Sequence, residues 1–507
     1  MINISNKREC FFDTYLINEE KTTAEVRVHH PVKREPVMIY DAPWEGNRSH
    51  YQTMTFDGEK YWMYYFAGTK RKLNGFCVAT SKDCMTWERP NCGIVEFEGS
   101  KDNNIIIANG VFPDHTSFDN FAVFYDNNPN CPKEEKFKAV SMWCGTGKLR
   151  AYCSEDGIHF RVHSVITEDG EFDSINLAFW DSERKKYFCY YRGEHEPSRD
   201  ADITVKSYTE KQAMMLYDPA RGAYRDPGDG SVAFTRDIRV IESTDFINWS
   251  KARPLTANGP DMQYYTSGVM PYPRAPHIFV AFPTRYVERK AWTPNYDELC
   301  GKDERQRKMK SSAREGLSLT DCLFMTSRDG YDFTRYDEAF FSPAPECPTN
   351  WYYGNCYPAT FLLETPSAIP GADNEYSFFC NESDYAVEDD SATAFCRFTV
   401  RLDGFVSRHA GGEEKVIITK PFIYEGDKLF ANIATSARGY AYFTLRCEAV
   451  EFTSYEVFGN SVDKQIHFEG NAVESLSGRE VILEVRLFDC DLYAIRFGEK
   501  QSNSNGK

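Results

Sequence analysis

Five copies of a short turn, each opened by an aspartate, constrain the fold of this chain more than any other feature. In four of them a Ser-x-Asp tripeptide leads to a large aromatic residue four positions beyond the aspartate. Consecutive aspartates lie 73 to 89 residues apart, a period that suits one four-stranded propeller blade with generous loops. The recurrence therefore predicts five blades. The pairs are Asp83 with Trp87, Asp156 with Phe160, Asp245 with Trp249, Asp329 with Phe333, and the degenerate pair Asp403 with Ser407.

The turn chemistry explains the recurrence. An aspartate side chain accepts hydrogen bonds from the backbone two residues further on, and Gly157 and Gly330 supply the positive φ of a tight hairpin. An apolar segment with the period of a β-strand precedes each turn. These segments begin at Tyr61, Phe137, Tyr187, His277 and Glu375.

The pattern of turns also predicts the domains. After the fifth turn the chain passes through a Gly-rich, charged stretch at 410–414, and short alternating strands follow without the blade motif. We expect an all-β protein, with a five-bladed β-propeller over residues 1–412 and a small C-terminal β-sandwich over 413–507. Residues 285–316, rich in Arg, Lys and Glu, are predicted to form a helical excursion or a loop over one face.

Composition narrows the partners. A formal charge of −17 argues against nucleic acid or an anionic membrane as partner, and favours a small or neutral ligand. The 16 cysteines are scattered singly, without a CxxC pair or a His-rich cluster, so we expect no metal and no cofactor. Reduced thiols and an opening MINISNKREC without an apolar core predict a cytoplasmic protein. The sequence favours no particular oligomeric state.

A resemblance to known enzymes follows from these motifs. A five-bladed propeller with a C-terminal sandwich looks like the layout of glycoside hydrolase family 32, and the stretch SLSGREVILEVRLFDCDLYAIRF from Ser475 is similar to the end of that family's sandwich. The Ser-x-Asp turns also resemble those of families 32, 43, 117 and 130. The opening motif WMNDPNG of family 32 is absent from this chain.

Three acids stand at comparable positions, 14 to 16 residues before an apolar second strand: Glu45, Asp173 and Asp261. The start of the innermost strands faces the funnel of a propeller, where polar residues can meet around a ligand. Glycoside cleavage needs one carboxyl group to protonate the leaving oxygen and a second to attack or to activate water. We therefore expect these acids to be catalytic, the alternative for each being a turn or cap residue.

The resemblance implies roles for the three acids. The stretch from Phe172 is similar to the family 32 stretch that begins RDP, with Phe172 and Ser174 in place of its Arg and Pro. By that match Asp173 is the transition-state stabiliser, Glu45 the nucleophile or base, and Asp261 the acid. Asp114 and Glu382 are held in reserve as substrate-binding acids. The literal RDP at 225–227 is interpreted as a surface turn.

Arginines and aromatic residues complete the expected site. Arg192, Arg236 and Arg285 lie at the ends of apolar strands, where a guanidinium group can hold sugar hydroxyls or a carboxylate. Aromatic side chains can stack on a sugar ring, and histidines can donate protons. The candidates are Trp44, Tyr264, Tyr265, Trp351 and Tyr352 for stacking, and His50 and His115 for donation.

Together these features predict a glycosidase that acts on a small oligosaccharide or glycoside. Two alternatives remain open. A glycoside phosphorylase resembling family 130 would use a single acid and gather the three arginines around phosphate. A carbohydrate-binding propeller without catalysis would fit the degraded family motifs.

Overall fold

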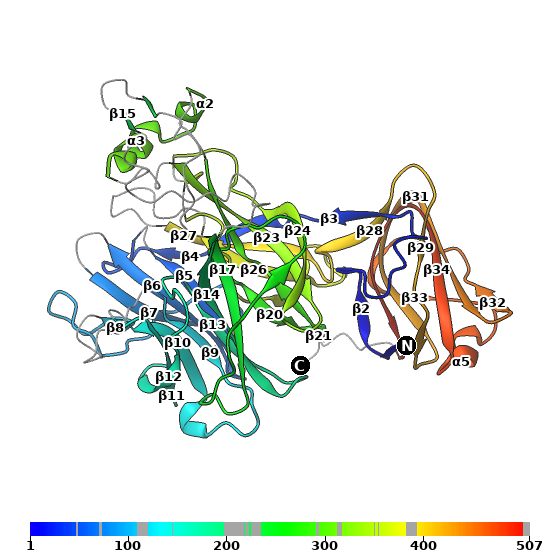
Figure 1. Ribbon diagram of the computed structural model, residues 1–507, viewed down its shortest axis with the longest axis horizontal. Coiled ribbons are helices and arrows are strands. Elements are labelled where there is room, and N and C mark those ends of the chain that lie inside the picture. The colour runs from blue at the N-terminus through cyan, green and yellow to red at the C-terminus, as the bar shows by residue number, and fades with distance from the viewer. Residues whose placement is uncertain are drawn as a thin grey trace.

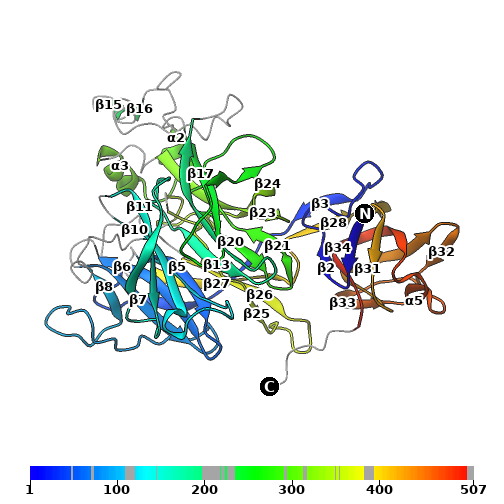
Figure 2. The same cartoon turned by 60° about the horizontal axis from the view of Figure 1, so that its bottom comes forward.

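The computed structural model of the chain describes thirteen stretches of sequence, and Figures 1 and 2 show them as a large and a small body of β-strands. The described residues are 1–46, 49–69, 73–108, 120–143, 146–196, 217–218, 223–224, 235–289, 294–311, 317–348, 350–352, 354–381 and 393–499.

The large body is built from five sheets that follow one another along the chain. The first strands of the first four sheets pack against one another in turn at the centre, so each sheet is a blade that runs outward from an innermost strand. Blade A comprises β5 (His50–Phe56), β6 (Tyr61–Thr69), β7 (Leu73–Ser81) and β8 (Ile105–Ala108); blade B comprises β9 (Ala122–Tyr125), β10 (Phe137–Trp143), β11 (Lys148–Ser154) and β12 (Arg161–Thr167).

The other three blades have the same order with small additions. Blade C comprises β13 (Leu177–Asp181), β14 (Lys186–His195), β17 (Thr235–Ser243) and β18 (Arg253–Pro254). Blade D comprises β20 (Val269–Tyr272), β21 (Ala275–Ala281), β23 (Ser318–Ser327) and β24 (Asp332–Phe341), with β19 (Thr256–Ala257) and β22 (Thr284–Glu288) added. Blade E comprises β25 (Leu363–Thr365), β26 (Glu375–Asn381), β27 (Thr393–Arg401) and β4 (Val32–Tyr40).

The predicted five-bladed propeller is confirmed, and the start of the chain closes the ring. β4, from the N-terminal region, pairs antiparallel with β27 and supplies the outermost strand of the last blade. A separate hydrophobic cluster fills each of the five junctions between neighbouring blades. Because these apolar contacts run around the whole ring, the blade ends are held in fixed positions around the axis.

The aspartate turns have the predicted chemistry in blades A to D. Each turn joins the third strand of its blade to the fourth, and the serine hydroxyl donates to the aspartate at 3.0 Å in all four copies. Each aspartate Oδ1 then accepts the backbone N–H groups two and three residues further on, at 2.8–3.0 Å. These bonds lower the pKa of Asp83 and of Asp329, although partial burial opposes the shift.

The fifth turn is used differently. Asp403 is fully buried, and its carboxylate accepts from Arg8 at 3.1 Å, Arg274 at 3.0 Å and the Tyr272 hydroxyl at 2.5 Å. Since β4 already occupies the outer edge of blade E, the chain after Asp403 leaves the propeller for the small body.

The small body is one connected sheet of ten strands around its own core. β31 and β34 pair along most of their length, with an irregularity between Thr435 and Tyr440. The predicted small C-terminal β domain is thus present. The strands are β1 (Ile2–Ser5), β2 (Arg8–Cys10), β3 (Glu25–Val28), β28 (Val406–Ala410), β29 (Lys415–Ile418), β30 (Phe422–Tyr424), β31 (Leu429–Cys447), β32 (Val450–Thr453), β33 (Asn460–Ile466) and β34 (Glu480–Phe497).

The strands of the small body do not all lie after residue 412, where the sequence predicted the domain boundary. β1, β2 and β3 lie at the start of the chain but belong to the C-terminal sheet, and Figure 1 shows β2 and β3 in blue beside the orange strands. Gly411 and Gly412 join β28 to β29, both of which pair with β34, so they form a connection within the sheet and not a linker. The hydrogen bond from Asp489 N–H to the Gly411 carbonyl, 2.9 Å, holds that connection in place.

The remaining elements are short. The charged stretch at 285–316 does form helices, α2 (Pro294–Asp297) and α3 (Lys302–Ser311), which lie above the propeller in Figure 1. No helix among the described residues is long and apolar enough to cross a membrane. The 15 cysteines among the described residues form no disulfide. Four further elements are η1 (Lys133–Glu135), α5 (Ala472–Leu476), β15 (Tyr217–Asp218) and β16 (Ala223–Tyr224).

Candidate functional site

The segments that lead into the innermost strands meet at the axis of the propeller. Asn120, before β9, donates to the Phe172 carbonyl at 3.1 Å, and Ser174, before β13, donates to the Tyr265 carbonyl at 2.5 Å. Asn176 fixes the turn that carries Asp173, because its amide donates to Phe172 and Ser174 and its oxygen accepts the Arg192 N–H. The lead-in segments of blades B, C and D are therefore joined directly.

Four tyrosines form a floor at this axis. Tyr265, which leads into blade D, stacks on Tyr357 of blade E with 5.4 Å between ring centroids and on Tyr286 with 5.9 Å. Tyr357 in turn stacks on Tyr51 of blade A at 6.0 Å. We call Tyr51, Tyr265, Tyr286 and Tyr357 the tyrosine floor. Tyr286 is fully buried and Tyr51 and Tyr265 are nearly so, and stacked aromatic rings of this kind form a rigid packed layer.

Two predicted arginines lie over this floor. The Arg192 guanidinium is 5.7 Å from the Tyr265 ring, and that of Arg236 is 5.9 Å from the same ring and 4.6 Å from Tyr286. Arg192 Nε also donates to the Glu171 carbonyl at 2.9 Å, and Arg236 donates to Gln263 at 2.5 Å. These bonds fix both side chains, which are buried, so the arginines are preorganised over the tyrosine floor.

Two carboxyl groups lie near Arg192. Asp173 Oδ2 is 3.5 Å from Arg192 Nη2, and its side chain is 71% exposed. Glu194 follows Arg192 by two residues on β14, so both side chains point to the same face, and it lies opposite Arg236 in register. Partial burial raises the pKa of Glu194; nearby Arg192 opposes this effect, while Glu171 adds to it. The sequence analysis did not select Glu194, although Arg192 two residues earlier was a candidate.

Glu45 does not belong to this group. Its side chain is fully buried, and its carboxylate accepts from Arg89 at 2.8 and 3.0 Å, from the Tyr65 hydroxyl at 2.5 Å and from Ala42 N–H at 3.1 Å. A carboxylate with these four bonds has no lone pair left to attack a substrate. The prediction of a nucleophile or base at Glu45 is corrected: it anchors the segment before blade A.

Asp261 lies in the segment that joins blade C to blade D, and its carboxylate is bound to a histidine. His195 Nε2 is 3.0 Å from Asp261, and its Nδ1 is 2.9 Å from Asp237. The hydrogen bond to Asp237 raises the pKa of His195 to about 9, against the opposing effect of burial. The imidazole is therefore charged at neutral pH and donates from both nitrogens, so the Asp261 carboxylate is held by a cation.

The other predicted binding residues divide into three groups. His50 is buried against Tyr51 at the edge of the floor, with 4.4 Å between the rings. Four others make structural contacts: Trp44 donates to Asn104, Arg285 is paired with Asp321 at 2.5 Å, the Tyr264 hydroxyl accepts from Arg335, and Trp351 donates to the Ala344 carbonyl. Asp114, His115 and Glu382 lie outside the described residues.

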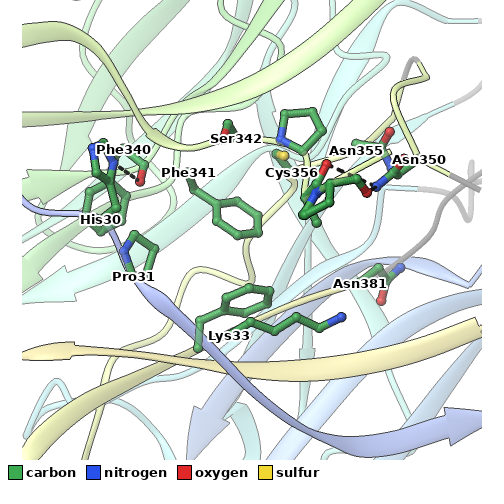
Figure 3. Close-up of a pocket in the computed structure, with 14 residues that line it drawn as sticks. His30, Pro31, Lys33, Phe340, Phe341, Ser342, Asn350, Asn355, Cys356 and Asn381 are labelled. Atoms are coloured by element: carbon green, nitrogen blue, oxygen red, sulfur yellow. Dashed lines mark hydrogen bonds between the residues drawn. The ribbon is translucent and has the colours of Figure 1, made fainter. Parts of the chain in front are cut away.

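A cavity of about 270 Å³ lies between blades D and E, and Figure 3 shows its lining. Phe340, Phe341 and Phe398 form its apolar part. The polar groups at its other end are already used: Asn350 bonds the Ala344 and Pro345 carbonyls, and Asn381 bonds Ser49 and Gln52. Among the described residues, no group of three His, Cys, Asp or Glu side chains is arranged to hold a metal ion.

Comparisons with known proteins add the following. No protein-family model matches the sequence, and no curated protein matches it. Among solved structures, the chain is similar to an N-acetylgalactosamine deacetylase from F. plautii (13% identity, TM-score 0.42, 74% of this chain and 95% of that one). It is also similar to a thermostable family-43 glycoside hydrolase (10%, 0.41, 74% and 95%) and to an exo-β-1,3-galactanase from Phanerochaete chrysosporium (8%, 0.37, 90% and 99%).

Proposed function

We propose that the chain is a glycoside hydrolase that cleaves a small oligosaccharide or glycoside over the tyrosine floor, between Asp173 and Glu194. The observation that carries this proposal is a pair of carboxyl groups, Asp173 and Glu194, that both lie near Arg192 in a five-bladed propeller. Glycoside hydrolysis needs two carboxyl groups with different tasks, and these two differ in environment.

Glu194 is the general acid of the proposed reaction. A carboxyl group with a raised pKa keeps its proton at a higher pH and can give it to the glycosidic oxygen as the bond breaks. Arg236, directly opposite on β17, can hold a hydroxyl of the departing group.

Asp173 supplies the second carboxylate. Its side chain is open to solvent and lies beside Arg192, so it can activate a water molecule, attack the anomeric carbon or balance the positive charge that develops on the sugar. Each of these roles requires its negative charge. Arg192 would orient both the sugar and Asp173, and the packed tyrosine floor beneath it would hold Arg192 in place.

The arrangement of the arginines bears on the phosphorylase alternative. That alternative needs Arg192, Arg236 and Arg285 together, but Arg285 makes a two-bond pair with Asp321 on blade D. Only the first two share the Tyr265 ring among the residues described.

A screen of aryl glycosides and short oligosaccharides, run with and without inorganic phosphate, tests the proposal. We expect release of free sugar at a rate that does not depend on phosphate, with loss of turnover in both Asp173→Asn and Glu194→Gln. A sugar phosphate as product would make the protein a phosphorylase. Carbohydrate binding without turnover of any substrate would make it a binding propeller.

A further inference from the structure

A second cavity, of about 670 Å³, lies between blades C and D, outside the tyrosine floor. Its volume is within the range of sites for small ligands, and it has room for a short oligosaccharide. One wall comes from the start of β17 and the end of β14, and the opposite wall comes from residues 259–264 and β24. His195 spans the two walls, because it bonds Asp237 on one side and Asp261 on the other.

The charged groups of this cavity are fixed in advance. Arg239 donates to the Glu194 carbonyl at 2.8 Å and to Asp169 at 3.0 Å, and Arg335 donates to the Tyr264 hydroxyl at 2.8 Å and to the Pro260 carbonyl at 2.9 Å. Two glycines make room for these arginines. A Cβ at Gly193 would lie 2.2 Å from Arg239, and one at Gly259, where φ is +79°, would lie 2.7 Å from Arg335.

The balance of charge indicates the class of ligand. The three cations His195, Arg239 and Arg335 face the carboxylates of Asp237 and Asp261, and the two arginines are also paired with carboxylates at the rim. The cavity therefore offers fixed donors and acceptors without a large excess of either sign, which suits hydroxyl groups better than an anion or a cation. Pro254, Leu255, Ala257 and Met262 supply apolar surface between them.

The cavity adjoins the proposed catalytic site. His195 is the residue after Glu194, and Asp261 precedes by two positions Gln263, the acceptor of the Arg236 hydrogen bond. We propose that this cavity binds a neutral oligosaccharide segment of the substrate, away from the bond that is cleaved. Calling this ligand part of a substrate rests on the proposed function. Binding of a neutral oligosaccharide in the cavity, however, can be measured without any turnover.

The test is calorimetric titration with neutral trisaccharides of gluco, galacto, xylo and arabino configuration, and with the same panel ending in a uronic acid. An Asp173→Asn background prevents consumption of the ligand. Thr256→Trp places a large ring at the exposed edge of the cavity, and His195→Gln removes the bridging cation. Ile247→Trp, on the exposed turn at the far end of β17, is the matched control, and thermal unfolding shows whether each variant folds.

We expect at least one neutral trisaccharide to bind, with affinity reduced tenfold or more by Thr256→Trp and by His195→Gln, and within twofold of the parent for Ile247→Trp. The same two variants should lower kcat/KM for that trisaccharide relative to its aryl monoglycoside. Unchanged affinity in both variants, binding of only the uronic-acid panel, or binding of no trisaccharide would overturn the inference. Cavity-dependent binding in a protein that cleaves no glycoside would leave this inference standing and reject the proposed function.

Discussion

At the scale of single residues, Asp173 and Glu194 differ in how much water reaches them. Asp173 is largely open to solvent, whereas Glu194 is partly buried on its strand and has a raised pKa. Arg192 is a neighbour of both. Differences of this kind let one carboxyl group carry a proton while the other carries a charge.

The pH dependence of hydrolysis tests the role of Glu194. A general acid is active while protonated, so activity should fall as the pH rises through its pKa. Glu171 helps to raise that pKa, and Glu171→Gln should therefore move the alkaline limb of kcat/KM to lower pH. Glu155→Gln, at an exposed turn of blade B, should leave the limb where it is. A limb that moves in neither variant contradicts the assignment.

For Glu45 we predict the opposite: its substitution should lower the stability of the protein and leave catalysis unchanged. Glu45→Gln removes the buried carboxylate that binds Arg89 and leaves this arginine with only the exposed carboxylate of Asp41, so it should lower the free energy of unfolding by about 1–3 kcal/mol. The folded fraction should keep its kcat, because the side chain does not reach the floor. Urea unfolding together with the turnover rate separates the two effects, and a large loss of kcat at normal stability would restore Glu45 as a catalytic candidate.

Which residues form the candidate site was harder to predict from the sequence than the fold. The distance of an acid from the next strand selected Asp173, which lies beside Arg192, but the same criterion selected Glu45, because nothing local shows that Arg89 will reach it. Asp261 was selected by position as well, and its partner His195 comes from a different strand, 66 residues earlier. Glu194 was missed because the search covered the starts of the innermost strands and not the ends of the second strands.

At the scale of elements, turn chemistry and strand periodicity were enough to place the blades. Four Ser-x-Asp turns have the same hydrogen bonds because those bonds are local and depend only on the tripeptide. The fifth differs because its surroundings come from distant parts of the chain. Arg8 and Arg274 lie 395 and 129 residues from Asp403, a separation that no local pattern reports.

Asp403 gives a stability prediction. The arginines around it hold the pKa of Asp403 at about 2, below its value in an unfolded chain, although burial opposes this shift. Its contribution to stability is therefore present above about pH 4 and is lost as the pH falls toward about 2. Asp403→Asn should cost about 3–5 kcal/mol at neutral pH, and the difference from the parent should shrink across that acidic range in urea unfolding. A constant difference at all pH values contradicts this account.

At the scale of the whole molecule, the start of the chain joins the two bodies. β1, β2 and β3 complete the small sheet, and β4 closes the last blade. The sequence predicted the two bodies but not this exchange, since the N-terminal strands have no blade motif and pair with partners near the other end of the chain. A boundary drawn from composition alone cannot detect such pairing.

Truncation tests this arrangement. A fragment of residues 413–507 lacks β1, β2, β3 and β28, so we expect it to be unfolded by circular dichroism. Removal of residues 1–40 should leave β27 without β4, its partner on the outer edge of blade E, and destabilise both bodies. Co-expression of fragment 1–412 with fragment 413–507 serves as the control and should restore a folded complex. A fragment 413–507 that folds alone, with a cooperative thermal transition, would contradict the pairing.

The most direct test of the central claim is the leaving-group dependence of hydrolysis by Glu194→Gln. A general acid matters most when the departing oxygen is strongly basic and little when the leaving group is already stable as an anion. On the sugar identified by the screen, the account predicts a fall of about 10²–10⁴ in kcat/KM for an unactivated alkyl glycoside and a much smaller fall for the dinitrophenyl glycoside. An equal fall for both substrates, or no fall for either in a folded variant, would contradict it.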